Sequence, residues 1–175
     1  MRFKIKILGL VVPLVFILDQ LTKKWIVSSI DLGGSIPIIP GIFDLVHARN
    51  PGAAFGFMAH LPASIRAPLF LILSTVTLSF LMVYFFRLQQ APRAVYFCLA
   101  LILGGALGNI YDRLTMGEVV DFLSFHWYDE AVHFGLGSYR VRFALEWPAF
   151  NVADAAISVA VFWLAILMLG KKNRD

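Results

Sequence analysis

Four long apolar segments confine this chain to the membrane. They cover about residues 5–27, 67–86, 94–111 and 149–169, and each approaches the roughly 20 residues that cross the hydrocarbon of a bilayer. The chain is 59% hydrophobic and 15% charged, and a soluble domain of 175 residues could not bury so much apolar surface. Only helices and closed barrels satisfy their backbone groups in lipid. The sequence therefore predicts an α-helical integral membrane protein, built as a four-transmembrane-helix bundle.

The basic residues predict how the chain is oriented. Eight of them fall in three short segments that share one side of a four-span protein: Arg2, Lys4, Lys6, Arg87, Arg93, Lys171, Lys172 and Arg174. Lys and Arg favour the cytoplasmic side, so we expect both termini there and the connections of about residues 28–66 and 112–148 outside. Because no small-x-small cleavage site follows the first apolar run, we interpret that run as an uncleaved first helix.

The sequence predicts one undivided membrane domain and gives no sign of a nucleic-acid partner. No internal repeat or low-complexity linker divides the sequence, so residues 1–175 are predicted to form a single integral membrane domain. The formal charge of +4 does not indicate nucleic acid, because the basic residues lie at membrane edges rather than in one stripe. Membrane phospholipid is the expected surrounding, and four spans with a self-contained site favour a monomer.

The outer connections are predicted to form a small extracytoplasmic β-sheet cradle. Residues 36–46 are mostly apolar and are interrupted by Pro37, Pro40 and Gly41, which indicates short strands and turns. Residues 139–147 place aromatic and aliphatic residues on one face and charged residues on the other, which is typical of a strand. We expect this strand to pair with residues 122–128.

Polar residues gather at one depth of the predicted bundle. Asp154 lies about 22 Å along an ideal helix from Leu169, and Asp19 about 21 Å from Ile5, so both reach the outer boundary of the hydrocarbon. The end of the third span adds polar residues at the same level, and one more acid follows after a short turn: Asn109, Asp112, Arg113 and Asp121. Ionisable residues at membrane depth usually line a functional cavity.

Two of these acids, Asp121 and Asp154, suggest acid–base chemistry. Two adjacent carboxyls share one proton, so one can activate water while the other protonates the substrate. The alternatives are a solvated loop acid for Asp121 and a helix-capping or packing acid for Asp154. The four His residues have no paired spacing typical of a zinc site, so we predict neither a metal nor another cofactor.

Five motifs in order resemble those of the lipoprotein signal peptidases, the type II signal peptidases of bacteria, and the resemblance covers essentially the whole chain. The matching stretches are DQLTK at 19–23, NPGAAFG at 50–56, GGALGNIYDR at 104–113, VVDF at 119–122 and FNVAD at 150–154. The connection of residues 122–148 looks longer than this family usually carries.

The resemblance implies a membrane aspartic endopeptidase of the bacterial inner membrane, with its active site at the outer leaflet. Its substrates would be diacylglyceryl-prolipoproteins, cut just before the lipid-modified cysteine, and Asp121 and Asp154 match the catalytic pair. Polar or turn residues that shape the site or hold substrate match at five positions: Asn50, Gly52, Asn109, Arg113 and Asn151.

Three further polar residues are expected to be structural. Asp19 and Lys23 are spaced as an i,i+4 ion pair, and Asp112 is placed to cap or pair at a helix end. Three glycines, Gly104, Gly105 and Gly108, are spaced to let helices pack closely.

Two other classes of function compete with the peptidase. A proton-coupled transporter also uses carboxylates in the membrane, but would place them near the midplane and often shows repeated halves. A structural four-span scaffold would leave Asp154 and the clustered Asn residues without a purpose. The sequence leaves open whether residues 57–63 gate the site.

Overall fold

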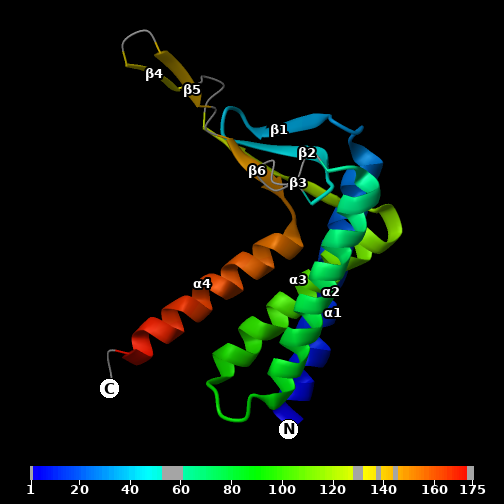
Figure 1. Cartoon of the computed structure of the whole chain (residues 1–175), viewed down its shortest axis with the longest axis vertical. Coiled ribbons are helices and arrows are strands. Elements are labelled where there is room, and N and C mark those ends of the chain that lie inside the picture. Colours follow the sequence, from blue (N-terminus) through cyan, green and yellow to red (C-terminus); the bar gives the residue numbers. More distant parts are fainter. Residues whose placement is uncertain (1, 53–60, 128–131, 137–138, 144–145, 173–175) are drawn as a thin grey trace.

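Four helices dominate the part of the chain that the computed structural model describes, which comprises residues 2–52, 61–127, 132–136, 139–143 and 146–172. They are α1 (Arg2–Ser29), α2 (Ala63–Arg87), α3 (Arg93–Met116) and α4 (Val152–Lys172) (Figure 1). All four are long and apolar enough to cross a membrane. The central helix is α3, which buries most of its apolar stretch, while the other three expose most of theirs. The predicted class of helical membrane bundle is confirmed.

Glycines in α3 allow α1 and α4 to approach it closely. A Cβ added at Gly104 would lie 2.9 Å from the Cβ of Val15 in α1. A Cβ at Gly105 would lie 2.5 Å from the backbone oxygen of Ala153 in α4, and one at Gly108 would lie 2.4 Å from Oδ2 of Asp19. The predicted role of these glycines in close helix packing is confirmed.

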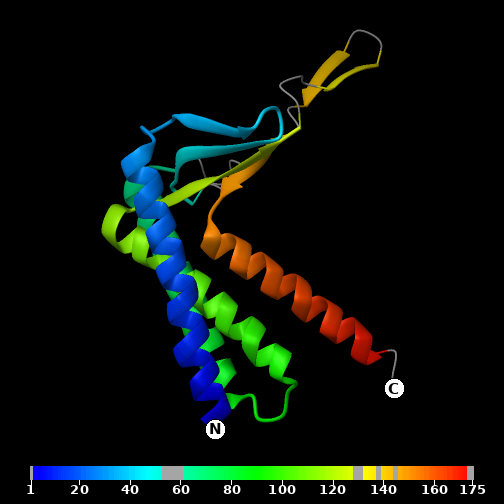
Figure 2. The same ribbon diagram turned by 180° about the vertical axis from the view of Figure 1, so that it is seen from behind.

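A four-stranded antiparallel sheet covers one end of the bundle (Figures 1 and 2). Its strands lie in the order β1 (Ser35–Ile39), β2 (Phe43–Asn50), β3 (Val119–His126) and β6 (Glu146–Phe150). The C-terminal end of α1 packs against this sheet: Ile26 and Ile30, the residue just after the helix, contact Val120 and Phe122 of β3. The predicted short strands within residues 36–46 are confirmed by β1 and β2.

The single strand predicted over residues 139–147 is wrong. Its first part, β5 (Tyr139–Phe143), pairs with β4 (Val132–Leu136) in a separate hairpin that projects beyond the larger sheet (Figure 2). Only the end of the predicted strand, in β6, pairs with β3, as expected for residues 122–128. Alternating polarity identifies strand residues but does not specify where a strand is interrupted.

Several helix boundaries also differ from the prediction, among them the start of α2 at Ala63 rather than near residue 67, and two of them have a clear local cause. The fourth helix begins at Val152 rather than near residue 149, because Ala149 and Phe150 belong to β6 and the Asn151 side chain accepts a hydrogen bond from the first turn. The third helix continues to Met116 and ends at Gly117, whose φ of 75° suits a left-handed cap. The sequence left open whether residues 57–63 gate the site, and residues 57–60 of that segment lie outside the described part of the chain.

The tight contact at Gly105 predicts a measurable loss of stability on adding one methyl group. Gly105→Ala should lower the free energy of unfolding by about 1–3 kcal/mol, because the new Cβ would meet backbone of α4 that has no freedom to move aside. Gly9→Ala is the matched control, since nothing lies within 4 Å of a Cβ at this exposed position in α1. Thermal unfolding in detergent measures both. Equal melting temperatures for the two variants would contradict this packing.

Candidate active site

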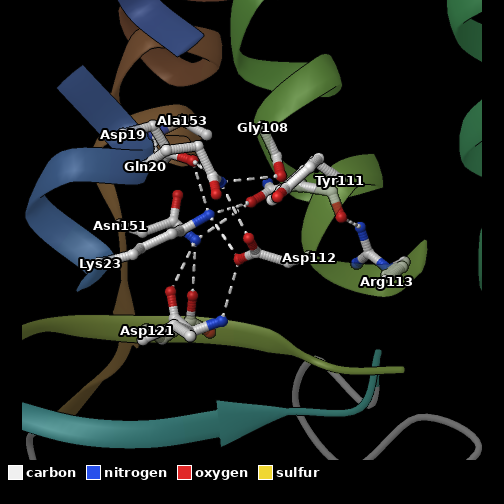
Figure 3. Close-up of polar contacts among 12 residues, drawn as sticks. Asp19, Gln20, Lys23, Gly108, Tyr111, Asp112, Arg113, Asp121, Asn151 and Ala153 are labelled. Carbon is white, nitrogen blue, oxygen red and sulfur yellow. Dashed lines mark hydrogen bonds and ion pairs between the residues drawn. The ribbon is translucent and has the colours of Figure 1, made fainter. Parts of the chain in front are cut away.

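A buried ammonium group links α1 to α3 at the end of the bundle that carries the sheet. Lys23 Nζ lies 2.7 Å from Asp19 Oδ2, 2.8 Å from Asp112 Oδ2 and 3.0 Å from Asn109 Oδ1 (Figure 3). The predicted i,i+4 pair of Asp19 and Lys23 is confirmed. Asp112 forms the pair predicted near the end of the third helix: its partner is Lys23 of α1, and it also accepts a hydrogen bond from the backbone N–H of Val120 at 3.2 Å.

Two side chains satisfy the first backbone N–H groups of α4. Asp19 Oδ1 accepts a hydrogen bond from the N–H of Ala153 at 3.0 Å, and Asn151 Oδ1 accepts one from the N–H of Asp154 at 2.9 Å. These are the groups that a helix leaves without partners at its N-terminus. The first turn of α4, and with it Asp154, is therefore fixed both to α1 and to the strand that precedes it.

Asp121 is a buried strand residue with an amide donor at each carboxyl oxygen. It pairs with Ala48 of β2, and only 2% of its surface is exposed. Its Oδ1 accepts a hydrogen bond from Asn151 Nδ2 at 2.7 Å, and its Oδ2 accepts one from Asn50 Nδ2 at 2.9 Å. The alternative of a solvated loop acid is wrong for this residue.

Asn50 is itself held by a turn. Its Oδ1 accepts a hydrogen bond from the backbone N–H of Gly52 at 2.9 Å, so that its Nδ2 faces Asp121. Gly52 has a φ of 95°, and a Cβ there would lie 2.3 Å from the ring of Phe70 in α2. The turn needs glycine both for this backbone conformation and for this contact.

Asn109 connects the ion network to Asp154. Its Nδ2 donates to Asp154 Oδ1 at 2.7 Å, while its Oδ1 accepts from Lys23 and, at 3.2 Å, from Asn151 Nδ2. Asn151 contacts Asp121 as well, so two side-chain amides join the two acids. Arg113, one turn after Asn109, donates to its backbone oxygen at 3.2 Å.

The surroundings of Asp121 favour its protonated form. Burial, reinforced by the negative charge of Asp154, raises the pKa of Asp121 to about 7. The hydrogen bonds from Asn50 and Asn151 and the positive charge of Lys23 act in the opposite direction. Over the pH range just below 7, the folded protein therefore keeps a proton on Asp121 that an ordinary aspartate has lost.

A cavity of about 740 Å³ opens beside the pair on the Asp154 side. It is bounded by the turn after β2, by α2, by β6 and by the first two turns of α4. Its lining includes Asn50, Gly52, Phe70, Arg113, Trp147, Pro148, Ala149, Phe150, Asp154, Ala155, Ser158 and Val159. Asp121 is joined to the cavity wall by its hydrogen bond from Asn50, whereas Asp154 itself lines the cavity. Among the described residues, the side chain of Asp154 accepts a hydrogen bond only at Oδ1, which leaves Oδ2 available to a water molecule in the cavity.

The structure brings all ten sequence-predicted polar and turn residues into one connected region, and two residues join them that the sequence did not single out. Gln20 donates to Asp112 Oδ1 at 2.9 Å and to the backbone oxygen of Gly108 at 3.3 Å. Its spacing of three from Lys23 on one helix was the available signal. Phe70 supports the turn and lines the cavity. In the sequence it is one apolar residue among many, so no signal was available.

Comparison with known proteins identifies the family. A model of the family described as "Signal peptidase (SPase) II" matches residues 11–170, which is nearly the whole chain. The chain belongs to the signal peptidase II family. It is therefore a peptidase, and one that crosses the membrane several times.

Similar proteins with curated descriptions support membership of the signal peptidase II family over about nine tenths of the chain. The chain is 43% identical over 162 residues to the lipoprotein signal peptidase of Syntrophotalea carbinolica. The aligned residues make up 92% of this chain and 89% of that protein. It is 42% identical over 158 residues to the lipoprotein signal peptidase of Geobacter sulfurreducens, with 90% and 88% covered.

Solved structures give the same result for the fold. A structure described as a bacterial membrane enzyme, solved by the in meso method at 2.3 Å resolution, superposes with a TM-score of 0.76 at 29% identity and covers 96% of this chain and 90% of its own. A second, described in the same words at 1.9 Å resolution, gives a TM-score of 0.73 at 30% identity, with 93% and 92% covered. The likeness to these bacterial membrane enzymes thus covers nearly the whole chain.

The environment of Asp121 predicts a titration that can be observed directly. In protein with ¹³C-labelled aspartate, the Asp121 carboxyl should titrate with a midpoint at about pH 7. Asp154→Asn should lower this midpoint, because it removes a negative charge that favours the proton. Asn50→Ala should raise it, because it removes a donor to the ionised form. A midpoint near 3.8, the ordinary aspartate value, would contradict the geometry described here.

Proposed function

We propose that this chain cleaves the signal peptide from prolipoproteins, N-terminal to the diacylglyceryl-modified cysteine. In the proposed mechanism, Asp121 and Asp154 together activate the water molecule that attacks the peptide bond. The observation that carries the proposal is the connection of these two acids through Asn109 and Asn151 at the edge of a large cavity. The names of the similar proteins, lipoprotein signal peptidases, support the substrate class.

The environments of the two acids support different roles for them. Asp121 is buried and holds the proton, so it donates to the carbonyl oxygen of the peptide bond. Asp154 borders the cavity in the first turn of α4, where it can meet a water molecule. It accepts a proton from the water as the water oxygen attacks the carbonyl carbon.

The protons then balance over one turnover. The attack forms a tetrahedral intermediate, in which the former carbonyl oxygen carries the proton from Asp121. Asp154 gives the proton that it took from water to the leaving nitrogen, and the carbon–nitrogen bond breaks. Asp121 recovers its proton when the carbonyl of the new carboxyl group re-forms. No covalent enzyme intermediate is needed.

Three residues that line the cavity support the binding of the substrate. Asn50 and Arg113 offer side-chain donors beside Asp154, and they suit the backbone oxygens of an extended peptide. Gly52 lines the same cavity without a side chain, which leaves room for the peptide next to Asn50. We assign all three to binding rather than to proton transfer.

The proposed orientation places the site at the outer leaflet of the bacterial inner membrane, with both termini in the cytoplasm. In support, α1 begins and α4 ends at the end of the bundle that lies away from the sheet (Figure 2). A diacylglyceryl anchor would then hold the cleaved bond at the depth of Asp154 and would raise its local concentration. We expect the enzyme to act as a monomer surrounded by phospholipid.

The proposed roles predict that neither acid can be replaced by its amide. Asp121→Asn and Asp154→Asn should each lower kcat by at least about 10²-fold, because each removes one partner of the proton transfer. The control is Asp44→Asn, since Asp44 is an acid of β2 whose side-chain partner is His126 rather than the catalytic pair. Cleavage of a purified diacylglyceryl precursor in micelles gives the rates. Near-normal turnover by either catalytic variant would refute the mechanism.

A further inference from the structure

The ammonium group of Lys23 is fully occupied by three oxygen atoms. An ammonium has three N–H donors, and Lys23 directs them to Asp19, Asp112 and Asn109 at 2.7, 2.8 and 3.0 Å. Only 3% of the side chain is exposed, and its acceptors come from both α1 and α3. Two charged acceptors would be enough to neutralise a buried lysine. The third acceptor is neutral, and it belongs to the residue that contacts Asp154.

We propose that Lys23 is a positioning residue for peptide hydrolysis: by donating to the side-chain oxygen of Asn109, it turns the amide nitrogen of Asn109 toward Asp154. This inference rests on the proposed function. Lys23 contacts neither acid of the pair through a hydrogen bond of its own, so it acts through Asn109 and is not itself catalytic.

The contacts of Asn109 allow only one orientation of its amide. Its oxygen faces two donors, Lys23 Nζ and Asn151 Nδ2, and its nitrogen faces the acceptor Asp154 Oδ1 at 2.7 Å. A flipped amide would place N–H groups against the ammonium and the Asn151 amide, and an oxygen against a carboxylate. All three contacts would become repulsive, and the positive charge of Lys23 makes the first of them especially unfavourable.

The position of Lys23 is in turn fixed by its neighbours. The oxygen of Asp19 that pairs with it lies where a side chain on Gly108 would be, since a Cβ there would come within 2.4 Å. Gln20 holds the other oxygen of Asp112 at 2.9 Å. The ammonium therefore cannot move with the side chain of Asn109 if that amide rotates. The hydrogen bond from Lys23 thus favours the orientation in which Asn109 Nδ2 donates to Asp154.

Lys23 also affects the proton on Asp121 through space. The charged groups that act around Asp121 are Asp154 from α4, Lys23 from α1, and Arg113 and Asp112 from α3. The positive charge of Lys23 lowers the pKa of Asp121, against burial and the charge of Asp154. Loss of the ammonium should therefore move the high-pH limb of activity, which depends on protonated Asp121, to higher pH. This shift reports the charge of Lys23 at Asp121, and a general loss of stability would not produce it.

The test compares Lys23→Met with Lys23→Met/Asp19→Asn, in which one buried carboxylate is neutralised together with the ammonium. For each variant, kcat, KM and the pH profile of kcat/KM are measured with a purified diacylglyceryl precursor. We expect kcat to fall at least about tenfold while KM stays within about twofold, because Lys23 does not contact the cavity. We also expect the high-pH limb to move upward.

The matched control is Lys24→Met, the same substitution at the next residue of α1, where the side chain is exposed rather than part of the network around Asn109. It should leave kcat and the high-pH limb at the wild-type values. If the folded double variant keeps wild-type kcat, or loses activity with an unshifted limb as a merely destabilised protein would, the inference is wrong.

Wild type and Asp154→Asn in the same assay separate this inference from the proposed function. If the wild type fails to cleave the precursor, or Asp154→Asn still cleaves it, the proposed function itself fails. If the wild type cleaves and Asp154→Asn does not, normal turnover by the Lys23 double variant overturns only the positioning role.

Discussion

The burial of one positive charge at the end of the bundle organises the site that surrounds it. Removing an ammonium from water is costly unless every N–H finds an acceptor, and Lys23 meets this requirement only where α1 and α3 bring Asp19, Asp112 and Asn109 together. The constraint extends further, because Asp19 also holds the start of α4. Three helices are thereby aligned at a single depth, and the glycines of α3 make their close approach possible.

The two acids take different roles because they are supported by the same amides in different surroundings. Asn151 donates to Asp121 and caps the helix that carries Asp154, and Asn109 donates to Asp154. Asp121 is buried, which favours its proton, while Asp154 borders the cavity. The position of the pair at the end of the bundle suits a peptidase better than a transporter, which would need its acids near the midplane.

Much of this arrangement could be predicted from local patterns in the sequence. Apolar length identified the four helices, the i,i+4 spacing gave the pair of Asp19 and Lys23, and small-residue spacing gave the close packing of α3. Each of these signals reflects an interaction between residues near in sequence, or a property of one segment in lipid.

The remaining features depend on contacts between distant segments. The burial of Asp121 follows from its place between β2 and the bundle, and the role of Gln20 depends on Asp112 in another helix. The strand predicted over residues 139–147 failed for the same reason, since its two halves found different partners. The start of α4 was misplaced because Ala149 and Phe150 are apolar enough for either a helix or a strand.

An experimental structure of the enzyme in a lipid mesophase, at a resolution that shows ordered water, would decide whether the two acids work as a pair. We expect the nearest carboxyl oxygens of Asp121 and Asp154 to lie within roughly 5.6 Å, the span that one water can bridge with two hydrogen bonds, and a water to occupy that position. Carboxyl groups that point away from each other, with a hydrophobic side chain between them, would contradict the account.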